Sequence, residues 1–271
     1  MIAKEIKRKF LNYYEDKDEK LFVSSLLDKL NKVETCGYVV HTQFLNQNEV
    51  KISSMILNTL KSNWYLYKPF EDTSKFVIFL IPDNYCDYDI KNIIKENIIF
   101  FKVSAFSNNI LLKHRECMGA IYSLGLNEKM IGDIFVVDGI CYFFCFKNNE
   151  QFFYNNLNKI SKYDVRIEKI NAQDENIVNI IKVNYENVQI IIPSLRVDSI
   201  LSKTFKLSRS ETNLKIKNGN LFINSKEMYF CAYEVKEDDI VSFRKYGKIK
   251  IGKIVRSTKS GKFVLEIMRY K

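Results

Sequence analysis

The chain has 271 residues, of which 46% are hydrophobic, 14% aromatic and 27% charged. These proportions exclude an intrinsically disordered chain and indicate a folded protein long enough for two or three domains. Residues 1–195 hold 24 basic and 24 acidic residues, so the net charge of +10 falls entirely on residues 196–271.

The sequence offers no segment that would take the protein into or across a membrane. The first ten residues, MIAKEIKRKF, alternate charged and apolar groups and lack the apolar core of a signal peptide. The longest apolar runs, FVIFLI and ICYFFCF, are far too short to span a bilayer. We therefore expect a cytoplasmic protein that makes no membrane contact.

The cysteines indicate reduced thiols and no metal centre. Six cysteines, at positions 36, 86, 117, 141, 145 and 231, form no CxxC pair, and the chain has only two histidines. A zinc site is therefore not expected, and cytoplasmic thiols of this kind are usually buried. Cys141 and Cys145 share one face of a predicted strand, which favours packing in the core.

Residues 1–74 are predicted to form a helical N-terminal domain. Apolar residues recur at helical spacing over residues 2–14 and 19–33. A third helix is expected over 49–61, after the turn-prone Asn46-Gln47-Asn48.

Residues 75–172 are predicted to form an α+β middle domain. Its expected elements are strands at 75–83, 98–106 and 163–170, helices at 88–97, 113–126 and 149–160, and two strands within 133–146. Asp138-Gly139 is a strong hairpin signal between those two strands. From Ile98 the order is β-α-β-β-α-β, typical of ferredoxin-like and RRM-like domains. Phe143 and Phe144 do not belong to an RNA-binding aromatic motif of the RRM kind, so we expect them to lie at least half in the core.

Residues 181–271 are predicted to form a basic C-terminal domain that closes with a hairpin. The polar run NAQDENIVN, 171–179, is expected to be a linker. A helix over 193–205 is expected to begin with Ser194 as its N-cap. A second helix is expected between Ser208, with Glu211 in a capping box, and the stop signal Asn218-Gly219. Residues 248–257 and 262–270 form the expected hairpin.

The second of these helices presents a basic face. Arg209, Asn213 and Lys217 recur every four residues and so share one side, while Arg196 and Lys203 share a side of the preceding helix. Such a face is most often simply solvated. Here it lies in the segment that carries the whole net charge, which is typical of a domain that binds a polyanion such as nucleic acid.

The basic segment resembles the S4 RNA-binding domain. LRVDSILSKTFKLSRS, IKNGNLFIN and VKEDDIVSF follow the pattern of that domain in order. The matching residues are Arg196, Asp198, Leu201, Ser208, Arg209, Gly219, Asn224 and Asp239. Lys215 stands where the pattern has an apolar residue, and Asp238 replaces the turn glycine. Either Leu214 or the stem of Lys215 is expected to cover the core there.

The upstream sequence is similar to the bacterial YlmH-type proteins. The matching stretches are LLDKLNKVETCGYVVHTQFLN and LKHRECMGAIYSLGLNEKMIGDI, and only SNWYLYKPF departs clearly, where relatives tend to have a glycine-rich loop. The resemblance implies a helical region, an RNA-binding-like middle domain and an S4 domain in this order. It also implies RNA binding on the large ribosomal subunit, near peptidyl-tRNA, in rescue or quality control of stalled translation. We expect a monomer whose RNA partners are rRNA and tRNA.

The expected RNA contacts are cations, amides and a hydroxyl of the C-terminal domain. They are Arg196, Lys203, Lys206, Ser208, Arg209, Asn213, Lys217, Asn224, Arg244, Lys245 and Lys248. Lys113, His114 and Arg115 form a second candidate contact, because their charge opposes the dipole of the helix they begin and a phosphate would relieve it. A surface turn in which His114 packs is the equally weighted alternative. Gly132-Asp133 is expected to shape the turn into the hairpin.

The alternative function is an RNA-modifying enzyme that uses an S4 domain to bind its substrate. A methyltransferase would need a glycine-rich nucleotide loop, and the chain has no GxGxxG. A pseudouridine synthase would need a catalytic aspartate, and Asp133 and Asp138 stand in turn contexts that do not match. We therefore expect no catalytic residue, no cofactor and a binding protein.

Overall fold

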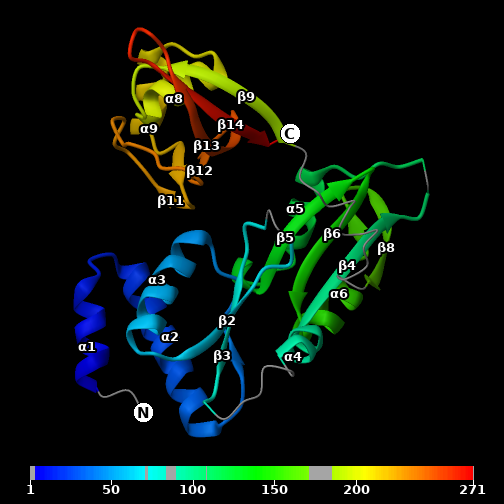
Figure 1. Cartoon of the computed structure of the whole chain (residues 1–271). Helices are drawn as coiled ribbons and strands as arrows, with labels where there is room; N and C mark the ends of the chain where they lie inside the picture. The colour runs from blue at the N-terminus through cyan, green and yellow to red at the C-terminus, as the bar shows by residue number, and fades with distance from the viewer. Residues whose placement is uncertain (1–3, 71–72, 84–89, 108, 171–184, 271) are drawn as a thin grey trace. The chain divides into compact units, whose positions relative to one another are not determined.

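The computed structural model describes residues 4–70, 73–83, 90–107, 109–170 and 185–270. The chain divides into two compact units, Met1–Lys182 and Val183–Lys271. The elements of each unit are shown in Figure 1. Helices and sheets both contribute, so the α+β class is confirmed. The expected linker at 171–179 and Cys86 lie outside the described residues, and the division into three domains stays a prediction.

The first unit begins with the three expected helices, α1 (Lys4–Tyr13), α2 (Lys17–Cys36) and α3 (Gln47–Thr59). Asp16 caps α2, and Asn46 and Glu49 form a capping box at the start of α3. Helix α1 packs on α2, and α2 packs on a sheet that was not expected. This sheet has the order β1-β3-β2 and is built from β1 (Val40–His41), β2 (Asn63–Tyr67) and β3 (Val77–Ile81). The strand predicted at 75–83 therefore pairs with strands of the first 70 residues and not with the middle sheet.

The second sheet of this unit has the order β5-β6-β4-β8-β7 and is antiparallel throughout. Its strands are β4 (Ile98–Ala105), β5 (Ile131–Val137), β6 (Ile140–Phe146), β7 (Lys159–Ile160) and β8 (Tyr163–Ile170). Its helices are α4 (Ile90–Asn97), α5 (His114–Ser123) and α6 (Glu150–Asn156), with 3-10 turns at Glu128–Met130 and Lys147–Asn149. The predicted order from Ile98 is confirmed. Asp138 and Gly139 both have positive φ, as a two-residue hairpin turn requires.

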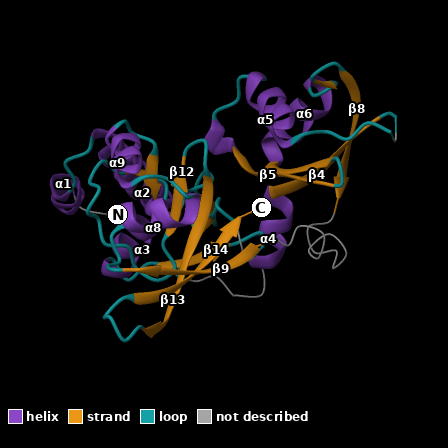
Figure 2. Ribbon diagram, turned by 90° about the horizontal axis from the view of Figure 1, so that it is seen from above, coloured by secondary structure: helices purple, strands orange, loops and turns teal. Residues whose placement is uncertain are grey.

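Both faces of this second sheet are covered. Helices α5 and α6 lie on one face and α4 on the other, as Figure 2 shows. Phe143 packs with Phe153 beneath α5 and α6, and Phe144 packs with Phe44 on the opposite face of the sheet. Phe143 and Phe144 are 0% and 1% exposed, so the expectation that they belong to the core is confirmed. Among the described residues, this sheet therefore presents no open aromatic face on which a base could stack.

Gly132 and Asp133 do not shape a hairpin turn, because they lie within β5. A Cβ on Gly132 would stand 2.7 Å from Phe144 Cβ and 3.0 Å from the ring of Phe44, so only glycine fits. The carboxylate of Asp133 accepts hydrogen bonds from Thr73 Oγ1 at 2.5 Å, from Ser74 N at 2.8 Å and from the Ser74 hydroxyl. The pair therefore fastens the segment before β3 to the second sheet.

The second unit is one antiparallel sheet with two helices on one face. The sheet order is β11-β10-β12-β13-β14-β9. Its elements are β9 (Tyr185–Ile192), α8 (Val197–Phe205), α9 (Arg209–Lys217), β10 (Leu221–Ile223), β11 (Lys226–Glu227), β12 (Ile240–Phe243), β13 (Gly247–Ser257) and β14 (Phe263–Tyr270). Ile200, Leu201 and Ile216 pack on the sheet. The closing hairpin is confirmed, and β9 was not expected.

The first helix of this unit begins later than its sequence predicts. Ser194 was expected to be the N-cap of α8, but the N-cap is Arg196. The loop between β11 and β12 holds the start of α8 instead, because Val197 N donates to Tyr233 O at 2.8 Å and Asp198 N to Cys231 O at 3.3 Å.

Candidate nucleic-acid interface

The buried side chain of Asp198, in the first turn of α8, binds two arginines. Its carboxylate accepts hydrogen bonds from Arg196 Nε at 3.1 Å and from Arg196 Nη2 at 2.7 Å. Arg209 Nε, in the first turn of α9, lies 3.6 Å from the same carboxylate. Asp198 is 0% exposed, whereas the side chains of Arg196 and Arg209 are 38% and 58% exposed. We call these three residues the Arg–Asp–Arg cluster.

The cluster is a positive site at neutral pH. Burial raises the pKa of Asp198, but hydrogen bonds from Arg196 and the charges of Arg196 and Arg209 outweigh it and hold that pKa below its ordinary value. The hydrogen bonds to Asp198 also raise the pKa of Arg196. One carboxylate against two guanidinium groups leaves a net charge of about +1. Their planar, multi-donor geometry suits a phosphate.

Helix α9 starts and stops where its sequence predicts. Ser208 Oγ accepts a hydrogen bond from Glu211 N at 3.1 Å, and Gly219 ends the helix with a φ of 74°. The expected capping box is only half formed, because the carboxylate of Glu211 accepts from the Tyr246 hydroxyl at 3.3 Å. The first turn of α9 therefore opens beside the Arg–Asp–Arg cluster with backbone N–H groups available to an anion.

The predicted basic face of α9 is confirmed only in part. Arg209 and Lys217 are exposed, but Asn213 between them is half-buried. The loop after β11 covers it, since Cys231 Sγ lies 3.7 Å from Asn213 O. Asn213 Oδ1 is buried and has no hydrogen-bond partner among the described residues. Asn213 is therefore not a freely solvated RNA contact of the kind expected.

The sequence left open whether Leu214 or the stem of Lys215 covers the core beside α9, and the structure decides between them. Leu214 is 61% exposed, so it does not cover the core. Lys215 Nζ lies 5.2 Å from the ring centroid of Tyr246 and 3.5 Å from Glu211 Oε1. The stem of Lys215 therefore covers this side of the unit.

Asn224 has a structural role, although it was expected to contact RNA. It is buried, and its Nδ2 donates to Asp239 Oδ1 at 2.7 Å while its Oδ1 accepts from Ile240 N at 3.0 Å. Its φ is 51°, in a turn. Both ends of the amide are occupied within the protein. Asp238, which replaces the turn glycine, has a φ of 67°, the conformation that explains why glycine is usual there.

The remaining candidates are divided between two sides of the unit. Lys203, Lys206 and Lys245 are exposed at the end of α8 and in the turn after β12. Arg244 and Lys248 instead lie over rings on the sheet face that points away from α8 and α9. The Arg244 guanidinium is 4.5 Å from the centroid of Phe222, and Lys248 Nζ is 4.7 Å from that of Tyr270. The predicted contact residues therefore do not form one continuous surface.

Lys113, His114 and Arg115 lie at the start of α5, as predicted, and all three are exposed. His114 Nε2 is 3.1 Å from Ile134 O, so this ring also links α5 to β5. The contact supports a packing role for His114. Lys113 and Arg115 stay candidate phosphate contacts.

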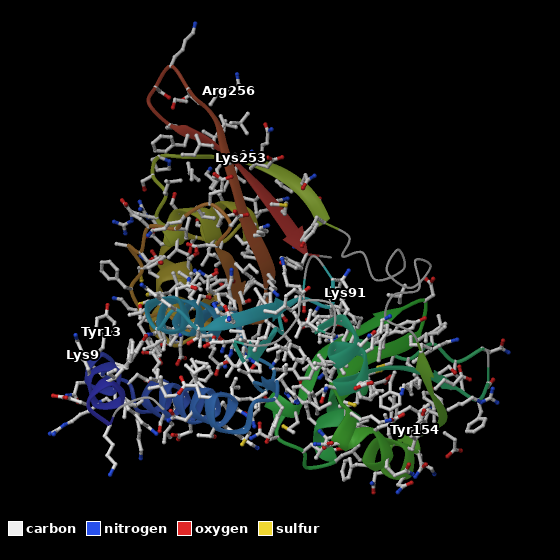
Figure 3. The ribbon with its side chains drawn as sticks, turned by 60° about the horizontal axis from the view of Figure 1, so that its bottom comes forward. Lys9, Tyr13, Lys91, Tyr154, Lys253 and Arg256 are labelled. Atoms are coloured by element: carbon white, nitrogen blue, oxygen red, sulfur yellow. The ribbon has the colours of Figure 1, made fainter. Side chains whose placement is uncertain are left out.

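Two exposed features of the second unit are not among the RNA contacts predicted from the sequence. Tyr229 and Phe230 project from the loop after β11. Lys253 and Arg256 lie along the outer arm of β13, as Figure 3 shows. Lys253 and Arg256 do have a signal in the sequence, because the run 240–265 has eight basic residues and no acidic one. The aromatic pair had no signal, because exposure of a ring cannot be read from a short irregular loop.

The residues that the structure describes include neither a metal-binding group of side chains nor a membrane-spanning helix. They hold no group of three or more histidine, cysteine, aspartate or glutamate side chains arranged to hold a metal ion. They also contain no helix that is both long and apolar enough to cross a bilayer.

The chain is similar to known proteins along most of its length. Residues 95–174 match a family model described as "Putative RNA-binding domain in YlmH". A relative from Bacillus subtilis, the ribosome-associated protein quality control protein P2, is 24% identical over 259 residues, covering 94% of this chain and 96% of the relative. The solved structure of the cell division protein ylmH from Streptococcus pneumoniae has a TM-score of 0.49 and 21% identity, and covers 60% of this chain and 96% of its own. The family-model match and the end-to-end alignment with the Bacillus protein show that the chain resembles YlmH-type proteins.

Proposed function

We propose that this protein is a non-catalytic RNA-binding protein that acts on the large ribosomal subunit, near peptidyl-tRNA, in rescue or quality control of stalled translation. The observation that carries the proposal is the Arg–Asp–Arg cluster, in which buried Asp198 orients Arg196 and Arg209 toward solvent. The family model over residues 95–174 and the name of the Bacillus relative support an RNA partner on the ribosome.

The second unit acts as an S4-like RNA-binding domain in this proposal. Phosphate contacts supply most of the affinity of proteins for nucleic acid, and preorganised arginines contribute them at low entropic cost. The net charge of +10 on residues 196–271 would steer the unit to RNA. The contact residues in this proposal are Arg196, Arg209 and Lys217 on the helices, with Lys203 and Lys206 at the end of α8 and Lys245 in the turn after β12.

The first unit has a different role in the proposal. Its second sheet is buried on both faces, so it would not bind RNA through stacked bases as an RRM does. Lys113 and Arg115, at the exposed start of α5, are the residues through which residues 95–174 would reach a phosphate. We further propose that the protein is a cytoplasmic monomer.

RNA modification is the competing function, and it is less well supported. The carboxylate of Asp133 is occupied by Thr73 and Ser74, which leaves no lone carboxylate aimed into an open site there. Purified protein incubated with rRNA and tRNA, with and without S-adenosylmethionine, should leave every nucleotide unchanged by mass spectrometry. Detection of a methylated or isomerised nucleotide would instead show that the protein is an RNA-modifying enzyme.

Cross-linking in cells with stalled ribosomes tests the proposal directly. The sequenced cross-links should fall on large-subunit rRNA and on tRNA, and should require Arg209. Cross-links confined to mRNA or to the small subunit would contradict the proposed site of action.

A further inference from the structure

Two adjacent aromatic side chains are exposed in the loop whose backbone holds the start of α8. Tyr229 and Phe230 are 55% and 64% exposed, in the loop that joins β11 to β12. Single exposed apolar side chains are common on protein surfaces, whereas exposed rings that are grouped together are candidates for a contact surface.

The loop that carries these rings is held rigidly. Met228 N donates to Leu221 O at 2.9 Å and Tyr233 N to Phe230 O at 3.2 Å. The backbone oxygen of Cys231 accepts from Asp198 N at 3.3 Å. The exposure of the rings is therefore a property of a fixed backbone and not of a loose loop, so the rings are preorganised for a partner.

The position of Tyr229 is fixed by its neighbours. A Cβ on Gly219 would lie 3.5 Å from Tyr229 Cε1, so the ring covers the end of α9 closely. A hydrogen bond to the Glu227 carboxylate raises the pKa of Tyr229. The ring is thereby held at its hydroxyl and along one edge, while more than half of its surface stays open.

The same backbone connects the rings to the two arginines. The backbone oxygen of Cys231, the residue after Phe230, accepts a hydrogen bond from Asp198 N. The Asp198 carboxylate in turn holds Arg196 and Arg209. The loop that carries the rings is therefore hydrogen-bonded to the helix turn that carries Asp198. A nucleotide has the matching pair of groups, a flat base and an adjacent phosphate.

We propose that Tyr229 and Phe230 stack on unpaired bases of the bound RNA while the Arg–Asp–Arg cluster holds a phosphate of the same RNA. The inference rests on the proposed RNA-binding function and specifies its substrate class, which is RNA with splayed-out bases in a loop, bulge or end. An uninterrupted duplex keeps its bases paired and stacked inside the helix, so it would use the arginines and not the rings.

The test compares two RNA probes with the full-length protein. One probe is a hairpin whose unpaired loop contains 2-aminopurine, and the other is a blunt duplex with the same stem. In the Tyr229→Leu, Phe230→Leu double variant the apolar character remains but the flat faces are lost. The variant should bind the hairpin about tenfold more weakly. It should also lose the quenching of 2-aminopurine that stacking causes, and should bind the duplex as the wild type does. Phe230→Tyr should bind like the wild type.

The control is Tyr13→Leu, since Tyr13 is an exposed ring on α1, in the other unit. It should leave both affinities unchanged, and thermal melts should show all variants folded. Equal hairpin binding by the folded double variant and the wild type would overturn the stacking proposal. Equal losses on hairpin and duplex would overturn it too, as would unchanged RNA binding with loss of a protein contact on the ribosome. A wild type that bound neither probe at low salt would instead overturn the proposed function itself.

Discussion

At the scale of single residues, Asp198 determines what the basic helices can do. An isolated surface arginine samples many rotamers and must be ordered on binding, which costs about 0.5–1.5 kcal/mol for each side chain. Arg196 is held by two hydrogen bonds to Asp198, and Arg209 lies 3.6 Å from it. Part of the ordering cost is therefore met during folding, so removing the carboxylate should weaken RNA binding even though it makes the protein more positive.

Asp198→Asn tests this expectation. The variant gains a positive charge relative to the wild type but loses the ion pairs, so affinity for a short structured RNA should fall about tenfold. The matched control is Asp238→Asn, because Asp238 is 73% exposed and asparagine tolerates its positive φ. It changes the charge equally and should bind slightly more tightly. Tighter binding by both variants in fluorescence anisotropy would show that net charge alone matters.

Asp198 should also make stability depend on pH. Its pKa is depressed in the folded state, so its stabilisation is complete above the ordinary value of 3.8 and is lost as pH falls through the lower folded pKa. Asp198→Asn should therefore cost about 1–3 kcal/mol near neutral pH. The difference in melting temperature between variant and wild type should shrink below about pH 4. A constant difference down to pH 2 would contradict the assigned ion pairs.

At the scale of elements, sequence patterns located most helices and the β-α-β-β-α-β order, because those signals are local. Caps such as Ser208, the Asp138-Gly139 turn and apolar periodicity each act within a few residues. The N-terminal sheet could not be predicted in the same way, since β1 has two residues and β3 pairs across about forty residues. The same difference between local and long-range signals applies to the candidate RNA-binding site. Arg209 and Lys217 were found from spacing, whereas the burial of Asn224 and the anchoring role of Asp198 depend on strands and loops far along the chain.

The contact between Asp133 and the segment before β3 should stabilise the first unit. Asp133→Asn removes a charged acceptor from two hydroxyl groups and two backbone N–H groups, so the free energy of unfolding should fall by about 1–3 kcal/mol. Asp164→Asn is the control, because the exposed pair with Lys159 at 3.6 Å should contribute less than about 1 kcal/mol. Chemical denaturation followed through Trp64, in the first unit, provides the measurement. Equal stability of the two variants would contradict the assigned role.

The core thiols of the second sheet should be unreactive in the native protein. Cys117, Cys141 and Cys145 are buried, and burial raises the pKa of Cys145, so little thiolate forms there. Cys36 is exposed and should react with a thiol reagent at once. Mass spectrometry of the labelled peptides should show the three core cysteines modified only after unfolding. Rapid labelling of Cys145 in folded protein would mean that the second sheet opens readily.

At the scale of the whole molecule, the two units differ in their net charge and in the features that they expose. The residues before 196 are neutral in sum, and the second sheet of the first unit is closed on both faces. The second unit carries the net charge, the Arg–Asp–Arg cluster and the exposed aromatic pair. This division predicts that RNA affinity depends on where positive charge is removed, and not on how much.

The most direct measurement is co-sedimentation of the full-length protein with purified large ribosomal subunits over a range of salt concentrations. Arg209→Gln with Lys217→Gln removes two cations from the helices, and glutamine avoids placing a carboxylate beside Asp198. The control, Lys9→Gln with Lys91→Gln, removes two exposed cations from the first unit (Figure 3). The first pair should weaken association about 100-fold at low salt and lower the slope of log affinity against log salt by about 2. The control pair should co-sediment as the wild type does. Full co-sedimentation by the folded Arg209→Gln, Lys217→Gln variant, or equal losses in both pairs, would contradict the account.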